Sequence, residues 1–207
     1  MTARWYFDFI SPYSYLQWRK LRSGPLQAHA ITPVPILFAA VLDAVGNRGP
    51  AEIPGKREFA YRHVLWRARR DGVPLRFPPA HPFNPLAALR LCIAAGSTVD
   101  AIDAVFDWIW AQGNAGDSVL ALAPVIEHLG LRAAAVSDPP VKSALHANTR
   151  AAIEAGVFGV PTLAIGDDRF WGDDAHEFAM AVLRQPDLLD DPEMRRLASL
   201  PVGVTRG

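Results

Sequence analysis

The residue best placed to do chemistry is Ser11, which follows an apolar, aromatic run that ends at Ile10. Serine is a favoured helix N-cap and proline a favoured first helical residue, so Ser11-Pro12 predicts a strand-to-helix junction. The Ser11 hydroxyl would then lie among unpaired backbone N–H groups at the positive end of a helix dipole, where an anion binds. A plain N-cap is the alternative, and the local sequence alone favours it. No Gly-x-Ser-x-Gly motif surrounds Ser11, which argues against a serine hydrolase.

The composition limits the class of protein. The chain has 207 residues, of which 50% are hydrophobic and 20% charged, as in a globular protein with a substantial core. Its formal net charge is zero, which argues against nucleic acid or an anionic membrane as the main partner. A single cysteine, Cys92, excludes an internal disulfide. The N-terminus lacks the pattern of a signal peptide and no apolar run has transmembrane length, so we predict a cytoplasmic protein, with no metal site.

The elements that would position Ser11 form a βαβ unit. Residues 4–10 are typical of a strand buried on both faces, because apolar side chains occur at odd and even positions. Residues 13–21 predict a helix, and residues 30–38 a second strand whose two prolines favour an edge position. Such a unit predicts a right-handed crossover and parallel strands. We interpret Asp8 as an acceptor of hydrogen bonds from nearby backbone rather than as a proton-handling group.

A long helical stretch follows, with little strand character between residues 39 and 155. Asn84-Pro85 predicts the N-cap and first residue of one helix. We expect Cys92 to be buried as a small hydrophobic residue, and Trp108 and Trp110 to serve in packing or in an interface. The expected helices are residues 39–45, 56–70, 86–95, a face of Ile102, Val105, Phe106 and Ile109, a face of Val119, Leu122, Ala123 and Ile126, and residues 141–155.

Strand patterns return after this stretch. Residues 160–165 and 169–171 predict two strands joined by a hairpin turn at residues 166–168. Asp173 or Asp174 is then expected to cap a helix. The buried face of that helix is expected to comprise Ala175, Phe178, Ala179 and Val182.

The order of elements is therefore βαβ, a helical insertion and ββα, which is the thioredoxin connectivity with helices inserted before the third strand. We predict an α/β fold with a thioredoxin-like βαβ…ββα sheet and a large all-helical insertion. The thioredoxin-like domain would comprise residues 1–38 and 156–207, and the inserted helical subdomain residues 39–155.

Three motifs together resemble a known family. They are Phe7-Asp8-Phe9-Ile10-Ser11-Pro12-Tyr13-Ser14-Tyr15, His81-Pro82-Phe83-Asn84-Pro85, and residues 156–162 followed by residues 170–174. In this order and spacing they resemble the 2-hydroxychromene-2-carboxylate isomerases, relatives of the kappa-class glutathione transferases and of bacterial disulfide oxidoreductases with helical inserts. The resemblance covers nearly the whole chain and implies an enzyme that uses glutathione.

The resemblance implies a glutathione site around Ser11. Ser11 and Ser14 stand where redox relatives have Cys-x-x-Cys, so dithiol exchange is impossible, and Ser11 would instead hydrogen-bond the sulfur of glutathione. A cis Val160-Pro161 peptide would offer the Val160 backbone to the cysteinyl part of glutathione as an added strand, and a trans edge proline is the alternative. The γ-glutamyl end would be bound by Trp171, Gly172, Asp173 and Asp174.

The second substrate, by the same resemblance a small aromatic carboxylate, would lie across from Ser11 between the two parts of the fold. Its carboxylate needs a cation or amide donors. The family often has a lysine near position 43, where this chain has Asp43, so the residue that binds the carboxylate stays open. Each candidate could instead be a solvated charge or a turn residue. The candidates are Asn47, Arg48, Lys56, His81 and Asn84. Aromatic residues that could form a wall of this site, or simply pack in the core, are Phe38, Tyr61, Trp66 and Phe83.

The implied reaction opens the ring of the chromene carboxylate and yields trans-o-hydroxybenzylidenepyruvate, a step in the breakdown of naphthalene-like aromatics. Glutathione would act as a nucleophilic catalyst and leave unchanged. A kappa-class-like glutathione transferase or peroxidase that consumes glutathione is one alternative, and a non-catalytic binding module is another. Relatives also suggest a homodimer.

Overall fold

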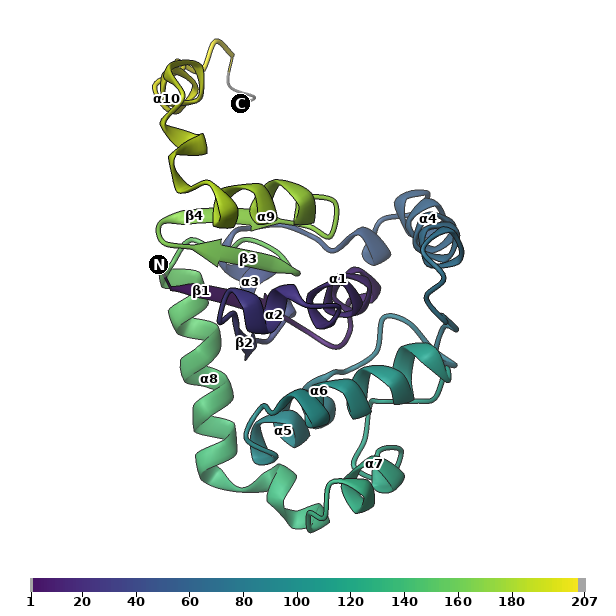
Figure 1. The fold of residues 1–207 in the computed structure, drawn as a ribbon. Coiled ribbons are helices and arrows are strands. Elements are labelled where there is room, and N and C mark those ends of the chain that lie inside the picture. Colours follow the sequence, from purple (N-terminus) through teal and green to yellow (C-terminus); the bar gives the residue numbers. More distant parts are fainter. Residues whose placement is uncertain (1, 205–207) are drawn as a thin grey trace.

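A four-stranded sheet forms the centre of the computed structural model, which describes residues 2–204 (Figure 1). The strands are β1 (Ala3–Phe7), β2 (Thr32–Pro35), β3 (Thr162–Ile165) and β4 (Asp168–Trp171). Their order is β2-β1-β3-β4. β1 pairs in parallel with β2 and antiparallel with β3, which forms an antiparallel hairpin with β4. The predicted parallel βαβ unit and the C-terminal hairpin are confirmed.

The first two strands are shorter than predicted. β1 ends at Phe7 because the carboxylate of the buried Asp8 accepts hydrogen bonds from the backbone N–H groups of Ile10, at 3.0 Å, and Phe38, at 2.9 Å. This confirms the interpretation of Asp8 as a backbone acceptor. β2 is an edge strand, as predicted, and its prolines at positions 33 and 35 offer no N–H groups to a ladder.

Helices account for most of the remaining chain. The α-helices are α1 (Pro12–Arg22), α2 (Pro25–Ala28), α3 (Phe38–Ala44), α4 (Lys56–Arg70), α5 (Leu86–Ala94), α6 (Val99–Phe106), α7 (Ala123–His128), α8 (Pro139–Glu154), α9 (His176–Arg184) and α10 (Pro192–Ala198). Short 3-10 turns are η1 (Pro50–Glu52), η3 (Ala133–Ser137) and η4 (Pro186–Asp190), and a π-helical turn, η2 (Asp107–Ala111), continues α6.

Most of the predicted helices are present, and the differences from the prediction lie at their first and last residues. The face of Ile102, Val105, Phe106 and Ile109 is fully buried, as predicted. α5 begins at Leu86, as the predicted range 86–95 has it, but its N-cap is Pro85 rather than Asn84, although the Asn84 side chain still accepts the Leu86 N–H at 3.1 Å. α7 begins only at Ala123, because Pro124 fits a first helical turn but cannot supply an N–H further inside a helix.

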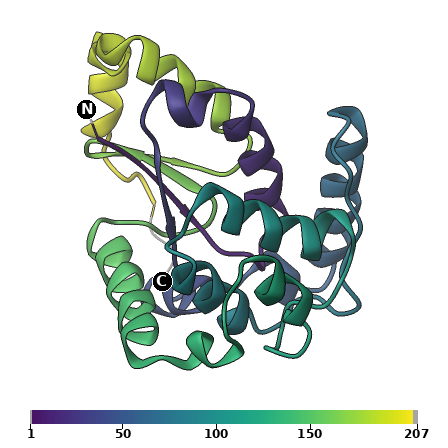
Figure 2. The same cartoon turned by 60° about the horizontal axis from the view of Figure 1, so that its bottom comes forward.

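Helices cover both faces of the sheet. On one face Trp5 and Phe7 pack into a large core with α1, α5, α6 and α9. On the other face Tyr6 packs with residues of α3 and α8, which are the first and last helices of the stretch predicted as an insertion. Figure 2 shows α8 on one side, the teal helices of this stretch gathered below the sheet, and α4 standing apart on the side opposite α8. β1 is therefore buried on both sides, as its sequence predicted.

Two further features follow from the packing. Cys92 is fully buried, as predicted, and burial raises the pKa of its thiol to about 12. Among the described residues, no helix combines the length and apolar character needed to cross a membrane.

Candidate functional site

Ser11 caps α1, as predicted. Its backbone is extended, with φ −90° and ψ 114°, and its Oγ accepts a hydrogen bond from the Ser14 N–H at 3.2 Å. Because Oγ accepts from the helix, the hydroxyl hydrogen is free to be donated to a ligand. The last turn of α1 carries Arg19, Lys20 and Arg22, which complement the negative end of the helix dipole.

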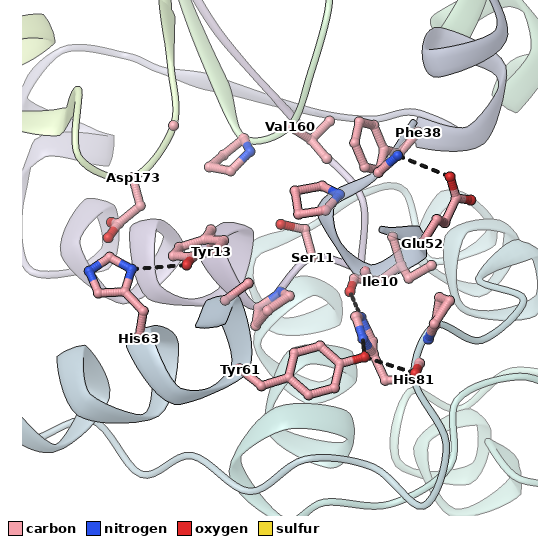
Figure 3. A pocket seen from close by; sticks show the side chains of 18 of the residues that line it. Ile10, Ser11, Tyr13, Phe38, Glu52, Tyr61, His63, His81, Val160 and Asp173 are labelled. Atoms are coloured by element: carbon pink, nitrogen blue, oxygen red, sulfur yellow. Dashed lines mark hydrogen bonds between the residues drawn. The ribbon is translucent and has the colours of Figure 1, made fainter. Parts of the chain in front are cut away.

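Ser11 lines a cavity of about 340 Å³ between the end of the sheet and the helical stretch (Figure 3). All seven residues predicted to bind glutathione line the same cavity. They are Ser11, Val160, Pro161, Trp171, Gly172, Asp173 and Asp174. The structure thus brings together residues that are about 150 positions apart in the sequence.

The segments that face Ser11 are held in place by backbone contacts. The Val160-Pro161 peptide is cis, as predicted. The Pro161 carbonyl accepts the Gly172 N–H at 2.8 Å, and the Gly172 carbonyl accepts the side-chain amide of Gln17 at 3.2 Å. Gly172 has a φ of +94°, and a Cβ there would collide with the Asp174 side chain, so this turn requires glycine.

Asp173 is a buried anion at one end of the cavity. Its carboxylate forms ion pairs with Lys20 of α1, at 2.9 Å, and with Arg67 of α4. Both carboxylate oxygens lie within ion-pair distance of a cation but outside hydrogen-bond geometry. The buried Nε of Arg67 has no hydrogen-bond partner among the described residues, so it remains available as a donor.

The predicted capping role of Asp173 or Asp174 is wrong. α9 begins at His176, its N-cap is Ala175, and no side chain caps it. Asp173 does not cap α9 because its carboxylate forms ion pairs with Lys20 of α1 and Arg67 of α4 instead. Phe178, predicted on the buried face of α9, is 43% exposed, whereas Ala179 and Val182 are buried.

A second, charged cavity of about 510 Å³ adjoins this end and shares Arg67, Asp173 and Asp174 with the first. Its other charged or titratable lining residues are Arg19, Lys20, Arg70, Asp71, His176 and Glu177. Burial lowers the pKa of His176, which favours a neutral ring. The charged end of the site can therefore accept a ligand that carries both an ammonium and a carboxylate.

The other end of the cavity holds a histidine–tyrosine pair. The His81 Nε2 lies 2.8 Å from the Ile10 carbonyl oxygen, and its Nδ1 lies 2.6 Å from the Tyr61 hydroxyl (Figure 3). A carbonyl can only accept, so Nε2 carries the proton of the neutral ring and Nδ1 is an acceptor. The Tyr61 hydroxyl also lies 2.8 Å from the His81 carbonyl oxygen, so its single hydrogen is shared between that oxygen and Nδ1. Burial lowers the pKa of His81, which keeps the ring neutral at pH 7.

A second pair of this kind lies at the border of α1 and α4. The Tyr13 hydroxyl and the His63 Nδ1 are 3.1 Å apart, and both residues line the cavity. Burial raises the pKa of Tyr13. Neither pair can be recognised from local sequence patterns, because Tyr13 and His63 are 50 positions apart and Tyr61 and His81 are 20 positions apart.

The candidates for binding the second substrate are scattered. Of these, His81 lines the cavity. Asn47, Arg48, Lys56 and Asn84 are exposed and do not line it. Of the candidate aromatic residues, Phe38 and Tyr61 line the cavity, whereas Trp66 is 56% exposed and Phe83 lies outside the lining.

One lining residue that the sequence analysis missed is Glu52. Its carboxylate accepts the Gly49 N–H at 3.0 Å across the 3-10 turn η1. A glutamate three residues after a glycine, next to Pro50, is an ordinary turn pattern, so nothing in the sequence distinguishes it.

Comparisons with known proteins identify the family of the chain. Residues 2–184 match the family model of the DSBA-like thioredoxin domain. The chain is 34% identical over 184 residues to the 2-hydroxychromene-2-carboxylate isomerase of Pseudomonas putida, an alignment that covers 84% of this chain and 90% of that protein. It is 28% identical to glutathione S-transferase kappa 2 of Caenorhabditis elegans, over 80% of this chain and 81% of the relative.

A solved structure gives the same result. A 2-hydroxychromene-2-carboxylate isomerase superposes with a TM-score of 0.75 at 28% identity, over 98% of this chain and 100% of the other. With its DSBA-like thioredoxin domain, the chain belongs to the family of the 2-hydroxychromene-2-carboxylate isomerases.

Proposed function

We propose that this protein is a glutathione-dependent isomerase that interconverts 2-hydroxychromene-2-carboxylate and trans-o-hydroxybenzylidenepyruvate. The observation that carries the proposal is the Ser11 hydroxyl at the N-terminus of α1, in a cavity that it shares with Val160, Pro161 and Asp173. The names of the relatives at 30–34% identity support the reaction. Since the single cysteine, Cys92, is buried in the core, dithiol redox chemistry is excluded for this chain.

The residues at the charged end fit glutathione. Cavities that bind small ligands typically measure about 300–1,000 Å³, and this one is about 340 Å³ before the adjoining charged cavity is counted. The buried Arg67 Nε is a donor without a partner among the described residues, as expected where an anionic ligand group binds. Lys20 and Asp173 add one charge of each sign for the amino-acid end of the tripeptide.

Glutathione, when bound, would supply a thiolate nucleophile that the reaction returns unchanged. Ser11 would donate its hydroxyl hydrogen to the sulfur, and the N-terminus of α1 would favour the negative charge. The Val160 backbone would pair with the cysteinyl part. Arg67 would bind the γ-glutamyl carboxylate, and Asp173 or the exposed Asp174 its ammonium. Trp171 and Gly172 would border that end.

The wall opposite the charged end suits an aromatic ring. Phe38, Leu42 and Tyr61 present apolar surface there, and the cavity is largely apolar along its length. Such a wall would hold the planar substrate face to face with the protein and exclude water from it.

The proposal is tested by incubating the protein with the chromene carboxylate and glutathione at far below substrate concentration. We expect many turnovers per glutathione with no loss of free thiol. No turnover in wild-type protein would contradict the proposal, and so would turnover that does not require glutathione.

A glutathione transferase acting on an uncharged electrophile is a second candidate, favoured by the charges around the cavity. Among the lining residues, Arg67 is the one lysine or arginine, and it is already paired with Asp173. The far end carries Glu52, and the lysine that relatives often have near position 43 is replaced by Asp43 in this chain. A transferase would consume one thiol per product, so a thiol assay during turnover separates the two candidates.

Three broader parts of the proposal rest on the resemblance. A role in the breakdown of naphthalene-like aromatics follows from the substrate. A cytoplasmic location follows from the need for reduced glutathione, which the cytosol maintains. A homodimer is proposed by analogy with relatives, and sedimentation velocity of the purified protein would test it.

A further inference from the structure

The helical stretch between β2 and β3 holds the loop that precedes Ser11. The Trp110 Nε1 donates to the Phe9 carbonyl at 2.7 Å, and the His81 Nε2 donates to the Ile10 carbonyl at 2.8 Å. Two consecutive peptides of the thioredoxin part are thus fixed by side chains that come from residues 39–155 of the sequence.

Asp8 also holds this loop, through its carboxylate and its backbone carbonyl. The Ile10 N–H donates to the Asp8 carboxylate at 3.0 Å, and the Ser11 N–H donates to the Asp8 carbonyl at 3.1 Å. Ile10 therefore has both of its backbone polar groups bonded. The start of α1 sets the φ and ψ of Ser11, and the Ser11 Oγ accepts the Ser14 N–H. The position of this oxygen is therefore well defined.

The two donors are themselves immobilised. Trp110 is fully buried, and its carbonyl accepts the Arg76 N–H at 2.7 Å. The His81 ring lies edge to face with Trp110, at 5.5 Å between centroids, and its Nδ1 is bonded to Tyr61. A histidine held at both nitrogens cannot rotate without breaking a partly buried hydrogen bond, which is worth about 0.5–1.5 kcal/mol.

From this geometry we infer that His81 and Trp110 are positioning residues for the thiolate bound at Ser11. Neither would touch the reacting atoms. Each would act through the Phe9-Ile10 backbone, which sets where the Ser11 hydroxyl and the N-terminus of α1 point. The inference rests on the proposed function, because it assumes that glutathione binds there. A hydrogen bond to an anion depends strongly on direction, and a displacement of about 1 Å near a reacting group can lower a rate about 100-fold.

The test uses two variants that remove a donor and keep a ring, His81→Phe and Trp110→Phe. His81→Gln is the conservative variant, since its side-chain amide can still donate to Ile10. His146→Phe, at an exposed position on α8, is the matched control. The first measurement is the pKa of the thiol of bound glutathione, titrated through the ultraviolet absorbance of the thiolate. The second is kcat and the KM for glutathione.

We expect the thiol pKa in His81→Phe and Trp110→Phe to rise toward that of free glutathione, and kcat to fall about 10- to 100-fold with little change in KM. His81→Gln should restore most of both quantities, and His146→Phe should match wild type. If both ring-retaining variants are folded by circular dichroism and keep the wild-type thiol pKa, the inference is wrong. Equal losses in His81→Gln and His81→Phe would also overturn it for His81.

The same measurements distinguish this inference from the proposed function. If wild-type protein lowers the thiol pKa of glutathione but does not convert the chromene carboxylate, the proposed substrate is wrong, and the titration still decides the role of His81 and Trp110. If wild-type protein does not bind glutathione, the proposed function and this inference both fail.

Discussion

The two ends of the cavity differ in the forces that build them. At the charged end, Lys20 and Arg67 meet the buried Asp173 from two separate helices. At the apolar end, Phe38, Leu42 and Tyr61 form the wall, and the carboxylate that lines the cavity there, Glu52, belongs to an exposed turn. A tripeptide with fixed charges can be recognised by buried ion pairs, whereas an aromatic ring is recognised by shape. Substitutions at the charged end should therefore change binding and stability together, and those at the apolar end should change selectivity alone.

The largest effect on activity is expected where the two ends meet, at Ser11. Ser11→Ala removes the donor to the thiolate, and loss of one such donor typically lowers kcat about 100- to 1,000-fold. The lost N-cap should also lower the free energy of unfolding by about 1 kcal/mol. Steady-state kinetics at saturating glutathione measures the first effect, and urea unfolding the second. Ser11→Thr, which keeps the hydroxyl, serves as the control. If the alanine and threonine variants both keep the kcat of the wild-type protein, Ser11 is only a helix cap.

Arg67→Met tests the charged end. It leaves Asp173 buried with Lys20 as its remaining cation, and removing one partner of a buried ion pair typically costs about 3–5 kcal/mol. Because Lys20 remains, we expect the lower value, about 3 kcal/mol, in urea unfolding. The KM for glutathione should rise about tenfold, which corresponds to about 1.4 kcal/mol of binding energy.

The control for this prediction is Arg69→Met, an exposed arginine on the same helix. It should change neither quantity. If Arg67→Met has the wild-type free energy of unfolding and the wild-type KM for glutathione, the charged end is not a binding site and the contrast between the two ends disappears.

Asp8 connects the loop before Ser11 with the apolar end, because its carboxylate accepts hydrogen bonds from the N–H groups of Ile10, beside Ser11, and of Phe38 in the apolar wall. Burial raises its pKa from 3.8 to about 7. The folded state then holds a proton that the unfolded state has lost between these values, so the stability of the protein should fall as pH rises from about 4 to about 7. Between about pH 5 and about pH 7 the Asp8 contribution amounts to about 2 kcal/mol.

Unfolding free energies of wild type and Asp8→Asn across this pH range measure that contribution. Asparagine cannot accept from both N–H groups, so the variant is expected to be less stable overall, and the quantity to compare is the slope with pH. Parallel slopes in the two proteins would show that Asp8 does not titrate in this range.

The same contrast explains what sequence patterns could predict. Ser11-Pro12 caps a helix through interactions within four residues, so the rules for helix ends were sufficient there. The capping role of Asp173 was predicted wrongly because Lys20 and Arg67, more than 100 positions earlier, determine where its carboxylate points. Local patterns contain no information on such pairs.

The apolar end was the least predictable part of the site. Its wall is assembled from α3, η1, α4 and the loop before α5, and residues enter it according to how these segments pack. Arg48 and Lys56 were predicted as candidates for binding the substrate because its carboxylate needs a cation, yet both side chains are exposed and lie outside the cavity. Glu52, which does line it, resembled an ordinary turn residue.

Glu52→Gln is the mildest test of the contrast. Glutamine can still accept the Gly49 N–H, so the turn is kept while the negative charge is removed from the apolar end. If the substrate is a carboxylate, its KM should fall about two- to fivefold, a small effect because Glu52 is exposed and its charge is screened. The KM for an uncharged electrophile should not change. Glu127→Gln, an exposed glutamate on α7 away from the cavity, should leave both values unaltered. An unchanged KM for the chromene carboxylate in Glu52→Gln would mean that its carboxylate binds away from the apolar end, and the division of the cavity into a glutathione end and a substrate end would be wrong.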